Sequence, residues 1–211
     1  KKYEKKYLTP RYMAYIAMSA MILIYVCILI SNSSISNFLM PFPAFAIILE
    51  IFTNPVLSFL VSILMLGILS VSLFLDSQIF FVFICAALSS SYLVSKISYA
   101  KRIDIIRCGI QVGFTMFFAM LFCSLFEVQT EAFSRLIEYN IQNPFLGLLN
   151  GIVSSMVAMF LIPIIEKFCK IVSPYALIEL ADQNQELLSK MRSSAPGTFQ
   201  HSLLVANLCE A

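Results

Sequence analysis

Residues 145–165 have the sequence FLGLLNGIVSSMVAMFLIPII, a run without a charged side chain. A helix that crosses the hydrocarbon core of a bilayer needs about 20 consecutive, mostly apolar residues, so this run predicts a membrane-spanning helix. Gly147, Gly151 and Ser155 recur every fourth residue along it. This spacing places small side chains on one helix face, where a second helix can approach closely.

The composition indicates that the whole chain belongs to the same environment. Of 211 residues, 60% are hydrophobic and only 12% are charged, and the mean hydropathy is +0.88. A soluble domain carries about 25% charged residues, so too few remain here to coat a surface in water. We predict an all-α, polytopic helical membrane bundle with six spans, at residues 12–31, 38–53, 56–75, 79–97, 105–126 and 145–165.

The second predicted span differs from the others because it is short and opens with Pro41 and Pro43. Proline is tolerated in the first turn of a helix but breaks a helix further in. The six cysteines show no paired spacing typical of a zinc site. We expect them to be small hydrophobic residues rather than a disulfide framework.

The basic residues are distributed unevenly between the loops, which predicts an orientation. Eleven of the fourteen lie in or beside three segments, the leading residues 1–11, the loop after the fourth span and the residues after the sixth. Only Arg135 lies on the opposite side. Because cytoplasmic loops are enriched in Lys and Arg, we predict a multi-pass protein of the cell (inner) membrane with both ends cytoplasmic. The outer loop 127–144 has apolar residues at helical spacing, typical of an interfacial helix.

Polar residues inside the spans bear on function. Gly109 and Gly113 form a second small-residue face, so these faces favour either a packed helix pair or a dimer contact. Gln111 and Asn150 can hydrogen-bond between helices. Glu50 and Glu166 lie near span ends, where we expect them to reach water or a lysine, and no central charged pair marks a transport path.

A polar segment follows the sixth span. Ser173 and Pro174 predict a helix start, with serine as the cap and proline at the first position. One amphipathic helix is expected from there to about Arg192, and it could act as a rigid relay. Pro196 and Gly197 end this link, and Thr198 is expected to cap the next helix. Ser173, Pro174, Pro196 and Gly197 are therefore the predicted hinges.

The last helix carries the chain's one histidine. His201, Leu204, Val205 and Leu208 have the spacing of one helix face, which we expect to be buried. A histidine on such a face is either a hydrogen-bonded core residue or a metal ligand. A catalytic metal site needs several ligands, so an enzyme cannot be argued from spacing alone.

Residues 161–211 resemble the bacterial seven-transmembrane HD-domain phosphohydrolases of the PgpH type. The resemblance lies in ordered motifs: Pro163 and Glu166 at the end of the last span, the Leu-x-Glu-Leu-x-Asp pattern ending at Asp182, the Ala-Pro-Gly-Thr turn at 195–198, and His-Ser-x-x-Val-Ala at 201–206. Gln200 stands where the family often has a further histidine. The spans agree more loosely, in number and in the basic loops.

The resemblance implies a cytoplasmic HD phosphodiesterase that hydrolyses cyclic di-AMP to the linear dinucleotide with two iron or manganese ions. His201 would be its first metal ligand. It also implies an outer domain, two further spans and a tandem His-Asp outside these residues, so 1–211 alone should be inactive. The partners implied are the lipid bilayer and the cyclic dinucleotide, with a homo-oligomer left open and no nucleic-acid polymer.

The expected organisation has four parts: a basic cytoplasmic loop at 1–11, a six-span module at 12–165, a linker helix at 166–194 and the start of the HD domain at 195–211. Two other classes of function stay open, a small-solute transporter or channel and a catalytically silent membrane receptor. A parent gene that continues with further His and Asp ligands would favour the phosphodiesterase over both.

The orientation can be tested with an impermeant thiol reagent on intact cells. In Arg135→Cys we expect labelling from outside, whereas Tyr3→Cys should label only after the membrane is opened, because basic loops are retained inside. The parent chain, with its six native cysteines, measures the background. Labelling of Tyr3→Cys in intact cells would reverse the predicted topology.

Overall fold

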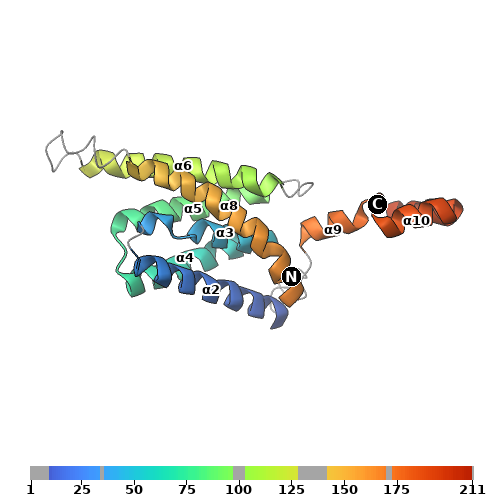
Figure 1. Cartoon of the computed structure of the whole chain (residues 1–211), viewed down its shortest axis with the longest axis horizontal. Helices are drawn as coiled ribbons and strands as arrows, with labels where there is room; N and C mark the ends of the chain where they lie inside the picture. Colours follow the sequence, from blue (N-terminus) through green and yellow to red (C-terminus); the bar gives the residue numbers. More distant parts are fainter. Residues whose placement is uncertain (1–9, 34–35, 97–102, 128–141, 170–172, 211) are drawn as a thin grey trace. The chain divides into compact units, whose positions relative to one another are not determined.

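The computed structural model describes residues 10–33, 36–96, 103–127, 142–169 and 173–210. These residues form helices and no strand, which confirms the predicted all-α membrane bundle. The chain divides into two compact units, Lys1–Ile171 and Val172–Ala211. The elements (Figure 1) are α2 (Pro10–Ser31), the 3-10 helix η1 (Asn37–Leu39), α3 (Phe42–Phe52), α4 (Pro55–Leu73), α5 (Ser77–Ser95), α6 (Ile103–Glu127), α8 (Gln142–Cys169), α9 (Pro174–Ala181), α10 (Glu186–Ser194) and α11 (Pro196–Glu210).

The number of full-length spans is a correction to the sequence prediction. Five of the described helices, α2, α4, α5, α6 and α8, are long and apolar enough to cross a membrane, whereas the segment Asn37–Phe52 is shorter. Helix α3 has 11 residues, which gives a length of about 16 Å, roughly half of the ~30 Å hydrocarbon core. The cause is Pro41 and Pro43, which restrict the helix start to Phe42 because proline lacks an N–H and clashes with a preceding turn.

Helix α3 lies at the centre of the first unit. Each of its residues from Phe42 to Phe52 is buried, and α2, α4, α5 and α8 all pack against it. The surrounding spans instead keep one apolar face exposed, as shown by Leu64 of α4 and Phe160 of α8. Apart from Glu50, α3 is apolar on all sides, and such a helix is the kind that other helices can enclose completely.

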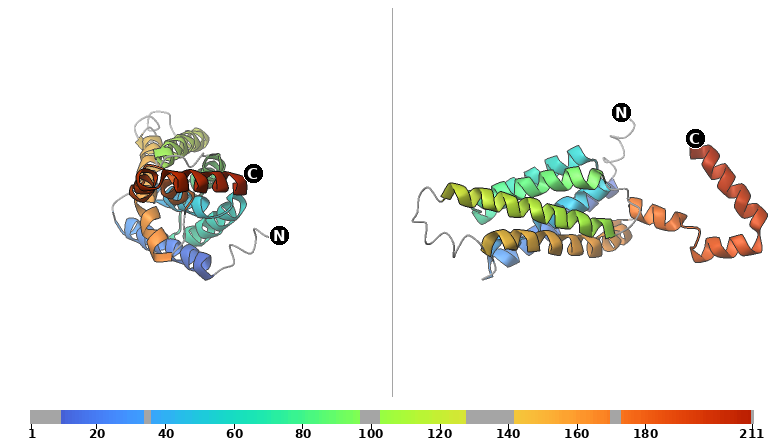
Figure 2. Two further views of the ribbon diagram at one scale, coloured as in Figure 1. Left: turned by 90° about the vertical axis from the view of Figure 1, so that its right-hand side faces the viewer. Right: turned by 90° about the horizontal axis from the view of Figure 1, so that it is seen from above.

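Consecutive segments of the first unit run in alternating directions (Figures 1 and 2). At the start of α2, the Tyr15 hydroxyl donates a hydrogen bond to the carbonyl oxygen of Ile48 at 2.7 Å, and its ring contacts Phe52 with centroids 4.9 Å apart. The beginning of α2 therefore meets the end of α3. The beginning of α2 and the end of α8 lie at the same end of the bundle, and which side of the membrane this end faces stays a prediction from the charges.

An asparagine closes the irregular backbone that precedes α3. Asn150 of α8 is 1% exposed. Its Nδ2 donates to the carbonyl oxygens of Phe38 at 2.7 Å and Met40 at 3.0 Å, and its Oδ1 accepts from Ser154 Oγ at 2.9 Å. In hydrocarbon, backbone groups without partners are costly, so non-helical backbone persists only where protein satisfies it. The interhelical role expected for Asn150 is confirmed, whereas Gln111 is exposed on α6.

The second unit differs from the single helix expected at 174–192. The Asp182 carboxylate accepts the backbone N–H of Asn184 at 2.9 Å, and Gln185 Nε2 donates to the carbonyl oxygen of Glu179 at 3.0 Å. Such local bonds compete with helical ones, and they separate α9 from α10. The prediction of one rigid helix to Arg192 is therefore wrong, because the segment forms two helices.

The helix starts in this unit are partly as predicted. The Ser173 hydroxyl accepts the N–H of Ala176 at 3.2 Å ahead of Pro174, which confirms the predicted start. Thr198 is not a cap, because α11 begins at Pro196 and Thr198 lies within its first turn. Proline supplies the favoured first residue there. The hinge role of these positions stays a prediction. The expected interfacial helix in 127–144 falls almost entirely outside the described residues.

Asn150→Leu should destabilise the bundle by about 2–4 kcal/mol, because the buried carbonyl oxygen of Met40 and the partly buried one of Phe38 would lose their donors, and each unsatisfied group costs about 1–3 kcal/mol. Ser154→Ala, which removes one bond and leaves the Phe38 and Met40 carbonyls paired, should cost about 1 kcal/mol. Thermal or denaturant unfolding in mild detergent measures both. Equal stability of the two variants would contradict the role given to Asn150.

Candidate functional site

Helices α6 and α8 meet through small residues, here named the α6–α8 seam: Gly109, Gly113, Gly147, Gly151 and Ser155. A Cβ atom added at Gly109 would lie 2.1 Å from the Cβ of Ser155, and one added at Gly151 would lie 2.4 Å from the Cα of Gly113. Real Cβ atoms essentially never approach other atoms within 3.0 Å. The two backbones therefore touch at distances that only glycine permits.

The rest of the seam shows the same close approach. A Cβ atom at Gly113 would lie 2.8 Å from the carbonyl oxygen of Leu148, and one at Gly147 would lie 3.0 Å from the Met120 sulfur. The residues along α6 meet residues of decreasing number along α8, so the two helices are antiparallel. Inside a bilayer the hydrophobic effect does not drive helices together, so their association depends on close packing, which small residues at the interface permit. In this structure both small-residue faces are occupied within one chain.

A second feature of the first unit is the buried carboxyl group of Glu50 in the last turn of α3. Glu50 is 2% exposed, and its carboxyl lies beside the hydroxyl groups of Ser58 and Ser91. Its Oε2 has no hydrogen-bond partner within the part of the chain that the structure describes. The expectation that Glu50 reaches water or a lysine is therefore wrong. Intramembrane ionisable groups are costly and commonly functional.

The third feature is His201, in the second turn of α11. His201 is exposed, and so are Leu204, Val205 and Leu208, at 60%, 44% and 77%. These four residues have the helical spacing that the sequence predicted, but their face is not buried. The side chain that α11 buries is Phe199, at 4% exposure, and α10 is the element that packs on this helix. The choice between a core histidine and a metal ligand therefore stays a prediction.

The described residues do not form a metal centre by themselves. Across residues 10–33, 36–96, 103–127, 142–169 and 173–210, no group of three or more His, Cys, Asp or Glu side chains is placed to hold a metal ion. The same residues contain no disulfide; Cys27 and Cys108 are buried and Cys209 is exposed. A two-metal site needs several ligands around both ions, and His201 is one candidate for such a set.

These features define a class of protein: a polytopic helical membrane module joined to a separate helical unit that carries an exposed histidine. Residues 1–173 match the family described as 7TM receptor with intracellular HD hydrolase. The chain belongs to this family. The predicted family is thereby confirmed, and the match covers the membrane-spanning region and the first part, 161–173, of the segment that carried the resemblance.

Several curated proteins are similar to this chain. The cyclic-di-AMP phosphodiesterase PgpH of Bacillus subtilis (strain 168) is 35% identical over 127 residues, covering 57% of this chain and 17% of the relative. The protein of the same name from Listeria monocytogenes serotype 1/2a (strain 10403S) is 28% identical over 211 residues, covering 98% of this chain and 29% of the relative. An uncharacterised protein of Synechocystis sp. is 32% identical over 126 residues, covering 60% and 15%.

The chain thus spans less than a third of the length of these curated relatives. No solved structure matches it.

The α6–α8 seam can be tested with matched glycine variants. Gly151→Ala should destabilise the bundle by about 2 kcal/mol or more, because its methyl group would overlap α6, and overpacking typically costs about 1–3 kcal/mol. Gly67→Ala on α4 is the control, since nothing lies within 4 Å of the added Cβ. Alanine is favoured over glycine in helices by about 1 kcal/mol, so this control should be neutral or stabilising. Thermal unfolding that moves both variants in the same direction would contradict the seam.

Proposed function

We propose that this chain is the membrane module, with the beginning of the catalytic domain, of a cyclic-di-AMP phosphodiesterase. The observation that carries the proposal is the family match over residues 1–173, joined to the PgpH relative that aligns over 98% of the chain. The phosphodiesterase activity named for that relative would belong to the whole protein. Residues 1–211 alone should be inactive.

In the proposed enzyme, His201 is one ligand of a pair of divalent ions, iron or manganese. The His-Ser-x-x-Val-Ala match at 201–206 supports this assignment. The metal ions would activate water for attack on the phosphodiester and stabilise the developing charge, and the product would be the linear dinucleotide. The remaining His and Asp ligands are expected outside these residues.

The proposed membrane module lies in the cell (inner) membrane with both ends of this chain cytoplasmic. A signal would pass from α8 through α9 and α10 to α11, with Ser173, Pro174, Pro196 and Gly197 as hinges. The break at 182–185 adds a third place where the connection can bend. Transmission would then be by movement of short segments rather than by rotation of one rod. A homo-oligomer is compatible with this scheme.

A second candidate function is transport of a small solute or proton, and Glu50 is the observation that favours it. Proton relays in membranes use buried carboxyl groups in chains. Glu50 has no second ionisable side chain as an ion-pair partner among the described residues. The phosphodiesterase accounts for the family match and for the resemblance around His201, and transport accounts for neither. A silent receptor would account for the bundle but not for the histidine.

The role of His201 is best tested in the complete protein. His201→Ala should lower metal content and cyclic di-AMP hydrolysis together, beyond the ~10–100-fold loss typical of residues that only orient a ligand. His201→Gln is closer in size to histidine and should behave like the alanine variant. Gln200→Ala changes the exposed neighbour and should keep both the metal and the rate.

Metal is measured by elemental analysis and hydrolysis by chromatography of the products. A folded His201→Ala protein with its full metal content and normal rate would remove His201 from the site. Intact metal binding with no cyclic di-AMP hydrolysis by the parent protein would instead refute the substrate.

A further inference from the structure

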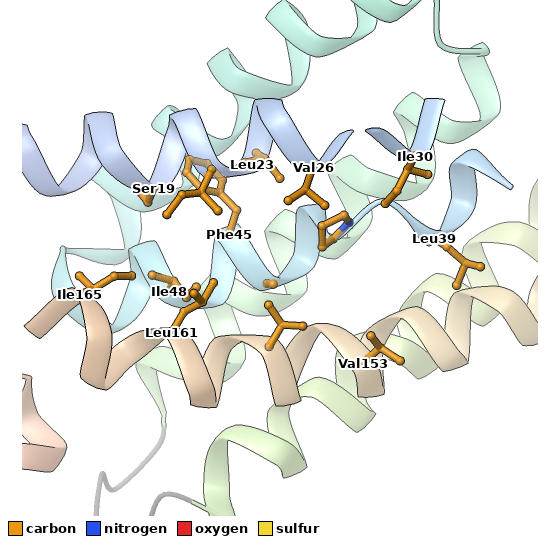
Figure 3. A pocket seen from close by; sticks show the side chains of 14 residues that line it. Ser19, Leu23, Val26, Ile30, Leu39, Phe45, Ile48, Val153, Leu161 and Ile165 are labelled. Carbon is orange, nitrogen blue, oxygen red and sulfur yellow. The ribbon is translucent and has the colours of Figure 1, made fainter. Parts of the chain in front are cut away.

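A long apolar cavity, here named the slot, separates α2 from α3 and α8. Its walls come from Ser19 to Ile30 of α2, from Leu39 to Ile48 of the η1–α3 segment, and from Val153 to Ile165 of α8 (Figure 3). Its volume is about 420 Å³, within the ~300–1,000 Å³ range of ligand pockets. At one end of the slot, Tyr15 of α2 contacts Ile48 and Phe52 of α3.

The chemistry of the walls restricts what can enter. Ser19 is the only lining residue with a polar side chain, and its hydroxyl already donates to the carbonyl oxygen of Ile16 at 3.0 Å. All the other lining side chains are hydrocarbon. A ligand with a buried polar group would lose its bonds to water without gaining others. The slot therefore suits a hydrocarbon.

The dimensions of the slot restrict the occupant further. Along α2 the lining extends from Ser19 to Ile30, and at 1.5 Å per residue this is about 16 Å, roughly half of the ~30 Å hydrocarbon core. A helix segment of this length, about 10–12 Å wide with its side chains, would fill roughly 1,300–1,800 Å³. That is more than the 990 Å³ of empty space in and around the slot. A single carbon chain, with contacts at ~4 Å on all sides, is the narrower occupant that such a space admits.

The position of the slot gives such a chain a way in. Ile22 and Val153, on the α2 and α8 walls, are 38% and 51% exposed, so the slot opens to the outside of the bundle. Both helices are among the five long enough to cross the membrane, so the opening faces lipid. An empty slot would lose the dispersion contacts of its walls, and an acyl chain from the bilayer restores them.

We propose that the slot is a binding site for one acyl chain of a membrane lipid. The acyl chain lies lengthwise between α2 and the α3–α8 wall. It takes the place of protein side chains that would otherwise fill the space between these helices. Since lipid tails are as apolar outside the slot as inside, retention rests on the fit to its walls rather than on the hydrophobic effect.

The test uses the full-length protein in vesicles that contain phosphatidylglycerol with a diazirine in the middle of one acyl chain. After irradiation, mass spectrometry of the digested protein locates the labelled residues. We expect labelling on the slot-lining residues of α2 and α8, with at most one lipid per protein molecule. The same labelling should be obtained when the protein is delipidated before irradiation, because the lipid in the slot is retained. Val71 of α4, 77% exposed and outside the slot, should lose its label under that treatment.

Val157→Phe divides the slot between Val153 and Leu161, which lie one helical turn to either side. It should lower the retained labelling at least fivefold. Val71→Phe is the matched control for the same exchange on an exposed face, and its slot labelling should be unchanged. If Val157→Phe is not monodisperse on size exclusion, Ala44→Val on the α3 wall provides a milder narrowing, with an expected loss of at least twofold.

Three results would overturn the proposal. The first is labelling that follows surface exposure alone and disappears on delipidation, which means annular lipid only. The second is slot labelling that the narrowing variants do not reduce. The third is a photoreactive amino acid at position 157 that cross-links to protein instead of lipid, which means that a helix occupies the slot. None of these depends on cyclic di-AMP hydrolysis.

Discussion

The bilayer core contains no water, so each backbone polar group at that depth must find its partner within the protein. Helix α8 meets this requirement for the part of the chain that cannot be helical. Its glycine face lies against α6, and Asn150, between Gly147 and Gly151, reaches the carbonyl oxygens ahead of α3. The close α6–α8 contact therefore positions the asparagine that allows the central helix to begin inside the membrane.

The central helix in turn determines where the bundle can open. Because α3 is only about half as long as the bilayer core is thick and is enclosed on all sides, the surrounding helices pack around a short centre. Two features result from this arrangement. One is the lone carboxyl group of Glu50 beside Ser58 and Ser91, and the other is the slot between α2 and the α3–α8 wall.

The spans and the helix start at Ser173 could be predicted from sequence, because long apolar runs and capping residues act locally. The prolines at 41 and 43 indicated a difficult second span, but only tertiary contacts show that the remaining helix is buried and that Asn150 supports it. The break at Asp182 could have been suspected from sequence, because an Asp side chain competes with helical hydrogen bonds for nearby backbone N–H groups. The regular spacing of the leucines predicted a continuous helix instead. For His201, spacing placed four residues on one helix face, and only tertiary contacts show that Phe199 is the side chain of α11 buried among the described residues.

Asn150 lies in the last span, more than a hundred residues after the carbonyl oxygens that it satisfies. During synthesis, the ribosome completes α2 to α6 well before this side chain exists. Until α8 inserts, the turn ahead of α3 has no amide partner from that helix, and α6 has no helix against its glycine face. The order of the chain thus makes maturation of the whole bundle conditional on its final segment, the same segment that leads directly toward the His201 unit.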